Sequence, residues 1–211
     1  MFKIPHLILF TIYVLLGSFS FFAINRVSKQ FQIALIFCGL VISLEGLSLY
    51  LSVIGKGNYL IVLIQVLTYV GTFFWFSSFN LSAELQEKRM FFFELFLLMW
   101  FFGLYGFQNG IWPSLIVLYF SMCIILLSLL GLLNLLKRNS EMNVLSSSLF
   151  WFYGSNFGFY CFSIMLFSLR ALERFNLKNN LHNDLIIYGN IILYLGLLNS
   201  VRLEIKNNRP L

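Results

Sequence analysis

Long apolar blocks separated by short polar segments run along the whole chain, and this pattern predicts membrane-spanning helices. A helix crosses the roughly 30 Å core of a bilayer with about 20 apolar residues. Seven apolar runs are close to that length. They are Leu7–Ile24, Gln32–Ile54, Tyr59–Leu81, Met90–Phe107, Pro113–Leu136, Val144–Leu169 and Leu185–Val201. Short connections favour antiparallel neighbours. We therefore predict one polytopic domain over residues 1–211, an all-α seven-transmembrane helix bundle with no soluble domain.

The lysines and arginines orient this predicted bundle. With the N-terminus outside, nine of the 14 basic residues lie on the inner side and five on the outer side. Inner loops of membrane proteins carry the excess of Lys and Arg. The bias predicts an N-out, C-in arrangement, and we expect an integral, multi-pass protein of a bacterial inner membrane.

Composition supports the same class. Hydrophobic residues make up 60% of the chain and charged residues 10%, against about 25% charged residues in soluble domains. That leaves too little polar surface for a water-soluble globule. The net charge of +6 is spread in pairs at the ends of runs. We therefore expect the lipid bilayer, and not nucleic acid, as the main surroundings.

The residue inventory argues against several membrane chemistries. The two histidines, His6 and His182, lie at the ends of runs, so paired axial ligands for a buried haem are missing. Asp184 is the single aspartate, which removes a two-aspartate protease. No lysine lies inside a run for a retinal Schiff base, and no cysteines form a CxxC pair for a metal. We expect no enzyme activity, cofactor or metal.

Polar side chains recur at helical spacing inside four of the runs. They are Glu45 in the second run, Gln65, Thr68, Tyr69 and Thr72 in the third, Tyr153, Asn156 and Tyr160 in the sixth, and Asn190 and Tyr194 in the seventh. Their matched depth predicts a polar pocket that holds a small-molecule ligand. The alternative is that each group bonds a neighbouring helix, typically worth about 0.6 kcal/mol.

Glu45 lies near the middle of its run. A carboxyl group at the bilayer midplane costs roughly 2.5–3.5 kcal/mol on insertion scales, so it is a functional candidate. It could also be a protonated structural group, hydrogen-bonded to Gln65 or Asn156. Both interpretations stay open at the sequence level.

Small residues form two further stripes. Gly39, Ser43 and Gly46 follow one face of the second run, and Gly154 and Gly158 follow one face of the sixth. Such residues let helices approach closely, so we predict that these faces pack against other helices.

Three classes of function fit these features. The first is a ligand-responsive sensor or accessory subunit of a membrane complex, which acts through a partner protein in the membrane or cytoplasm. The second is a small-solute or proton-coupled transporter using Glu45, and the third is a structural membrane anchor. In span count and orientation alone, the layout is similar to seven-helix sensory regions of bacterial kinases and to three-one-three small transporters. No motif assigns a family. The prolines lie at the ends of runs, so the kinks that transporters use are missing, which favours the first class.

Overall fold

The computed structural model describes residues 4–53, 64, 68–71, 73–77, 94, 101, 113–138, 144–171 and 179–207. The described part is helical almost throughout and contains no β-strand. Its long helices are α1 (Ile4–Ala23), α2 (Lys29–Val53), α6 (Pro113–Arg138), α7 (Ser148–Ala171) and α8 (Asn179–Asn207). The short 3-10 helices η1 (Ile24–Arg26) and η2 (Val144–Ser146) precede α2 and α7. Residues 68–71 and 73–77 are also helical and are called the 68–77 segment below.

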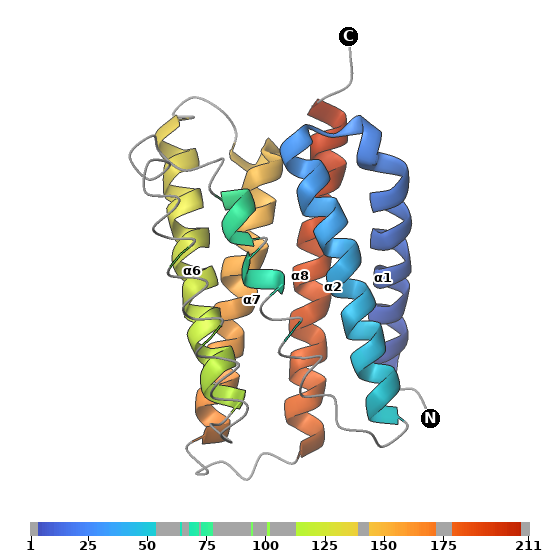
Figure 1. Cartoon of the computed structure of the whole chain (residues 1–211), viewed down its shortest axis with the longest axis vertical. Helices are drawn as coiled ribbons and strands as arrows, with labels where there is room; N and C mark the ends of the chain where they lie inside the picture. Colours follow the sequence, from blue (N-terminus) through green and yellow to red (C-terminus); the bar gives the residue numbers. More distant parts are fainter. Residues whose placement is uncertain are drawn as a thin grey trace.

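The long helices form a bundle (Figure 1). α7 packs against α6 and α8, α8 also packs against α1, and α1 packs against α2. The helices α1, α6 and α8 run in one direction, and α2 and α7 run in the other. As a result, the C-terminal ends of α1, α6 and α8 and the N-terminal ends of α2 and α7 lie at the same end of the bundle.

Three helical stretches are long and apolar enough to cross a membrane. They are Ile8–Arg26 with 19 residues, Phe120–Lys137 with 18 and Leu185–Asn207 with 23. α7 has 24 residues and carries serines, tyrosines and Asn156 among its apolar side chains. The all-helical part of the prediction is thus confirmed for the described residues. The runs predicted at Tyr59–Leu81 and Met90–Phe107 lie largely outside them, and the count of seven spans stays a prediction.

Some helix ends differ from the hydropathy boundaries. α6 begins at Pro113, as predicted, where the missing N–H of proline removes no helical hydrogen bond. α8 begins before the predicted Leu185 and continues past the predicted Val201. Polar residues lower the hydropathy at both of its ends without breaking the helix. Hydropathy therefore marks the apolar part of a helix and not its ends.

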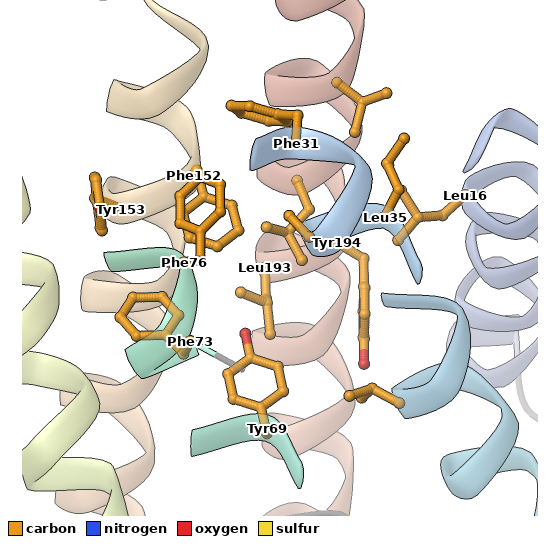
Figure 2. Close-up of a cluster of buried hydrophobic side chains, with 14 of the residues drawn as sticks. Leu16, Phe31, Leu35, Tyr69, Phe73, Phe76, Phe152, Tyr153, Leu193 and Tyr194 are labelled. Atoms are coloured by element: carbon orange, nitrogen blue, oxygen red, sulfur yellow. The ribbon is translucent and has the colours of Figure 1, made fainter. Parts of the chain in front are cut away.

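Buried apolar side chains from all five long helices form one core. Its members include Leu16, Leu35, Phe120, Phe152 and Leu193. Figure 2 shows the central part of this cluster.

The outer faces of the helices are also apolar. Phe10, Phe21, Phe22 and Ile192 are 64%, 77%, 76% and 67% exposed. Large apolar side chains on so many outer faces are typical of a surface covered by lipid or by another protein.

Candidate functional site

A buried hydrogen bond joins the 68–77 segment to α7. The Tyr69 hydroxyl donates to Oδ1 of Asn156, and Nδ2 of Asn156 donates to the Phe152 carbonyl oxygen at 2.7 Å. Asn156 has no exposed surface, and Tyr69 is buried. Two residues from different predicted stripes therefore meet inside the bundle, and each satisfies the polar group of the other.

Aromatic rings surround this pair. The Tyr69 ring lies 5.6 Å from Tyr160 and 6.4 Å from Phe73, the latter nearly parallel. Phe73 in turn stacks on Phe152 with a centroid distance of 5.4 Å. Figure 2 shows Tyr69 and Phe73 in the same cluster as Phe152. The ring contacts give the Tyr69–Asn156 bond apolar surroundings, in which it is stronger than in water.

Tyr153 fills a slot between the 68–77 segment and α6. Its ring meets Phe73 edge-on at 5.9 Å and lies 6.1 Å from Phe76. On the α6 side, a Cβ atom added to Gly131 would lie 2.6 Å from Cζ of Tyr153. The slot therefore exists because residue 131 has no side chain.

The polar residues of α8 lie in a different environment. The Tyr194 ring is buried and packs edge-on against Tyr13 of α1, with a centroid distance of 4.9 Å. Figure 2 shows Tyr194 on the side of Leu16 and Leu35, away from Tyr153. Asn190 is half-buried, as is Thr68. Tyr194 thus packs toward α1.

The remaining members of the predicted pocket cannot be placed. Gln65 and Thr72 lie outside the described residues, and so does the side chain of Glu45, although its backbone belongs to α2. The polar pocket as a whole stays a prediction.

Two buried hydroxyl groups belong to residues that are close in sequence to the ones that contact Tyr153. Within the described residues, Ser77 Oγ and Ser128 Oγ have no hydrogen-bond partner, and both side chains have no exposed surface. Ser77 follows Phe76, and Ser128 lies one turn before Gly131 on α6. Each serine is therefore within one turn of a residue that contacts Tyr153. An unpaired buried hydroxyl costs about 1–3 kcal/mol.

The predicted small-residue stripes are open within the described structure. A Cβ atom added to Gly39, Gly46, Gly154 or Gly158 would have nothing within 4 Å. The Ser43 hydroxyl donates to the Gly39 carbonyl of its own helix at 2.8 Å. The described helices do not cover these faces.

Close helix packing occurs at glycines that the sequence analysis did not select. Gly131 admits Tyr153, and a Cβ atom added to Gly196 of α8 would lie 2.4 Å from Cβ of Ser155 on α7. Each glycine shares a helical face with other small residues, Gly131 with Ser121 and Ser128, and Gly196 with Gly189 and Ser200. This spacing was the available signal.

A second polar cluster, missed by the sequence analysis, closes one end of the bundle. The Ser28 hydroxyl donates to Oε1 of Glu204 at 2.7 Å, and the Ser148 hydroxyl donates to Oε2 at 2.6 Å. The Ser200 hydroxyl donates to the Ser148 carbonyl at 2.7 Å. Glu204 is buried. These four residues are called the Glu204 clasp.

The clasp joins three parts of the chain. Ser28 directly precedes α2, Ser148 is the first residue of α7, and Glu204 lies in α8. The N-terminal ends of helices carry partial positive charge, so two of them favour an acid at this place. The spacing of Leu197, Ser200 and Glu204 was the available signal, because it continues the buried face of α8.

Within the described residues, no group of three or more His, Cys, Asp or Glu side chains could hold a metal ion. No protein-family model, curated protein or solved structure matches the chain. The function therefore has to be inferred from the bundle itself.

Proposed function

We propose that the protein is a non-enzymatic, multi-pass membrane protein that responds to a small polar ligand and acts through a partner protein. It would be a sensor or accessory subunit of a membrane complex. The buried hydroxyls of Ser77 and Ser128, which are unpaired within the described residues, carry this proposal.

The membrane placement is supported by the helix lengths and by the outer surface. Three helical stretches can cross a bilayer, and the outer faces expose large apolar side chains such as Phe21 and Phe22. With the predicted N-out orientation, the end that holds the Glu204 clasp faces the cytoplasm. Lys and Arg residues at that end agree with the positive-inside rule.

The ligand response is supported by the buried hydroxyls of Ser77 and Ser128, which have no partner within the described residues. A small molecule with a hydroxyl or carbonyl group would bond the Ser77 and Ser128 hydroxyls and recover part of their burial cost. The Tyr69–Asn156 bond lies in the same aromatic cluster, through Phe73. A ligand that displaced the Tyr153 ring from the slot would therefore shift the contact between the 68–77 segment and α7.

The experiment is copurification in mild detergent followed by mass spectrometry of both proteins and small molecules. The wild-type protein is compared with a Ser77→Ala/Ser128→Ala variant and with a matched control, Ser155→Ala. The Ser155 hydroxyl bonds the carbonyls of its own helix, at 2.6 Å to Trp151 and 3.2 Å to Phe152. Its loss should leave the slot unchanged.

We expect a stoichiometric partner with the wild type and with the control, and a changed partner yield with the double variant. The double variant should also unfold at the same or a higher temperature, because it removes two unpaired buried hydroxyls. A lone protein without partner or ligand in all three preparations would contradict the proposal.

A further inference from the structure

The side chain of Tyr153 occupies the slot between the 68–77 segment and α6 with a single six-membered ring. Phe73 and Phe152 meet this ring edge-on, with centroid distances of 5.9 and 5.5 Å and interplanar angles of 85° and 82°. Phe76 lies 6.1 Å from it. Figure 2 shows Tyr153 beside Phe152 and Phe76. The slot is therefore lined by aromatic rings and holds one ring.

The face of the Tyr153 ring lies against the backbone of α6. A Cβ atom added to Gly131 would be 2.6 Å from Cζ of Tyr153 and 2.7 Å from both Cε1 and Cε2. An atom in the plane of the ring, beyond its hydroxyl end, would be much farther from the two Cε atoms than from Cζ. The nearly equal distances therefore place Gly131 over the face of the ring. A flat ring fits this gap, whereas a puckered ring is thicker and would overpack it.

The elements that form the slot offer no counter-charge to a ligand. The ring contacts of Tyr153 given above are with phenylalanines and with Gly131. α6, α7 and the 68–77 segment contain no acidic residue, and their cations are Lys137, Arg138 and Arg170. On α6, the first of these follows Gly131 by six residues, which is about 9 Å of helix. A charged group buried in the slot would lose its hydration without a partner on these elements, which is strongly unfavourable.

The same elements do offer hydroxyl groups. Ser77 lies one turn after Phe73 in the 68–77 segment, and Ser128 lies one turn before Gly131 on α6. Their buried hydroxyls have no partner within the described residues. A ring that carries a hydroxyl or carbonyl oxygen would provide an acceptor for a serine hydroxyl.

We propose that the ligand is a neutral compound with a flat six-membered ring that bears a hydroxyl or carbonyl oxygen, and that this ring replaces the Tyr153 side chain in the slot. The inference rests on the proposed function, because it names the class of ligand for the same site. Tyr153 competes with the ligand. The apparent affinity is therefore lowered by the fraction of molecules in which the Tyr153 ring has left the slot.

The test measures thermal unfolding of the full-length protein in detergent with three probes of similar size, at equal concentrations. p-Cresol is neutral and flat, 4-methylcyclohexanol is neutral but puckered, and 4-methylbenzoate is flat but charged. p-Cresol should raise the unfolding midpoint by about 5 °C at a hundred times its Kd, and the other two probes should raise it less. A shift with either of the other probes that equals the p-cresol shift would overturn the proposal.

Matched variants locate the site. Tyr153→Ala empties the slot, so p-cresol should bind this variant at least about tenfold more tightly than the wild type. Gly131→Ala narrows the slot and should lose the p-cresol shift, whereas Gly158→Ala, with nothing within 4 Å of the new atom in the described structure, should keep it. Equal affinity in Tyr153→Ala and the wild type, or an equal shift in the two alanine variants of glycine, would overturn the site. If Tyr153→Ala does not fold, the two glycine variants decide.

The result separates this inference from the proposed function. The expected order of probes in a protein that copurifies with no partner would refute the proposed function and leave the ring-binding slot standing. A stoichiometric partner together with equal shifts for all three probes would keep the proposed function and overturn the inference.

Discussion

The middle of the bundle and its clasped end hold polar groups in different ways. In the middle, the neutral pair Tyr69 and Asn156 lies among aromatic rings, and packing depends on shape, as at Tyr153 and Gly131. At the end, the buried carboxyl group of Glu204 accepts hydrogen bonds from two serines that stand at the starts of two helices.

The difference follows from the backbone groups that are present at each level of the bundle. Helix N-termini, with their unpaired N–H groups and partial positive charge, exist at the ends of a bundle and not in its middle. An acid can therefore be held at the end by hydrogen bonds from serines that stand at the starts of two helices. In the middle, a neutral amide and a phenol satisfy each other at a lower desolvation cost. We expect polar contacts to dominate stability at the end and ring packing to dominate it in the middle.

The largest effect is expected for Glu204→Leu. The variant leaves the Ser28 and Ser148 hydroxyls without their acceptor, and hydrogen bonds to charged groups contribute about 1.5–3 kcal/mol each, so we expect a loss of about 3 kcal/mol. Chemical unfolding in detergent measures the loss. The control Arg202→Leu changes an exposed neighbour and should cost less than about 0.5 kcal/mol. Equal losses in the two variants would show that the Glu204 clasp contributes no more to stability than an exposed residue does.

Gly131→Ala tests whether the close fit of the Tyr153 ring against Gly131 stabilises the middle of the bundle. The new methyl group would lie 2.6 Å from the Tyr153 ring, and such overpacking typically costs about 1–3 kcal/mol. The control Gly158→Ala has nothing within 4 Å of the new atom. It should be neutral or more stable by about 0.5–1 kcal/mol, because alanine is the better helix former. The same unfolding assay applies. If both alanines behaved alike, the Tyr153 slot would have no role in stability.

Tyr69→Phe removes one hydroxyl and keeps the ring. We expect a loss of about 0.6–1 kcal/mol, the usual worth of a hydrogen bond inside a membrane bundle. Tyr188→Phe is the matched control, because Tyr188 is 51% exposed on α8. A loss in Tyr69→Phe as large as that in Glu204→Leu would contradict the expectation that polar contacts contribute more to stability at the end of the bundle than in its middle.

The smallest effect on stability is expected for Glu45→Gln. Glutamine keeps the shape and hydrogen-bonding capacity of a protonated carboxyl group but removes its titration. Under the proposed function, both the unfolding midpoint and the partner yield should stay at wild-type values. Loss of function in a stable Gln variant would instead support the proton-coupled transporter.

The sequence pattern selected the two polar stripes that meet at Tyr69 and Asn156, but it did not select the Glu204 clasp at the end of the bundle. Spacing of three and four residues selected Tyr69 and Asn156, because residues on one helical face share a neighbour. Glu204 was missed because hydropathy ended the last run at Val201, so the acid was placed in a polar tail. The helix continues because Leu197, Ser200 and Glu204 stay on its buried side.

The choice of close-packed glycines could not be predicted in the same way. Gly131 is tight because of one ring on another helix, and Gly196 because of Ser155. A small residue permits close approach but does not specify which helix approaches. The same limit explains why Gly154 and Gly158, which form the better sequence motif, have open space in the described structure.

The Ser28–Glu204 bond also sets an order for biosynthesis. Its two ends are 176 positions apart, and at a synthesis rate of about 5–20 residues per second they leave the ribosome roughly 10–35 s apart. Throughout that time, the start of α2 lacks its acidic partner, and the start of α7 waits a shorter time for the same residue. The hydrogen bonds from Ser28 and Ser148 to Glu204 therefore cannot form until α8 is inserted. A chain that stalls before Glu204 would lack the hydrogen bonds at this end of the bundle. Cellular quality control could recognise it by that difference.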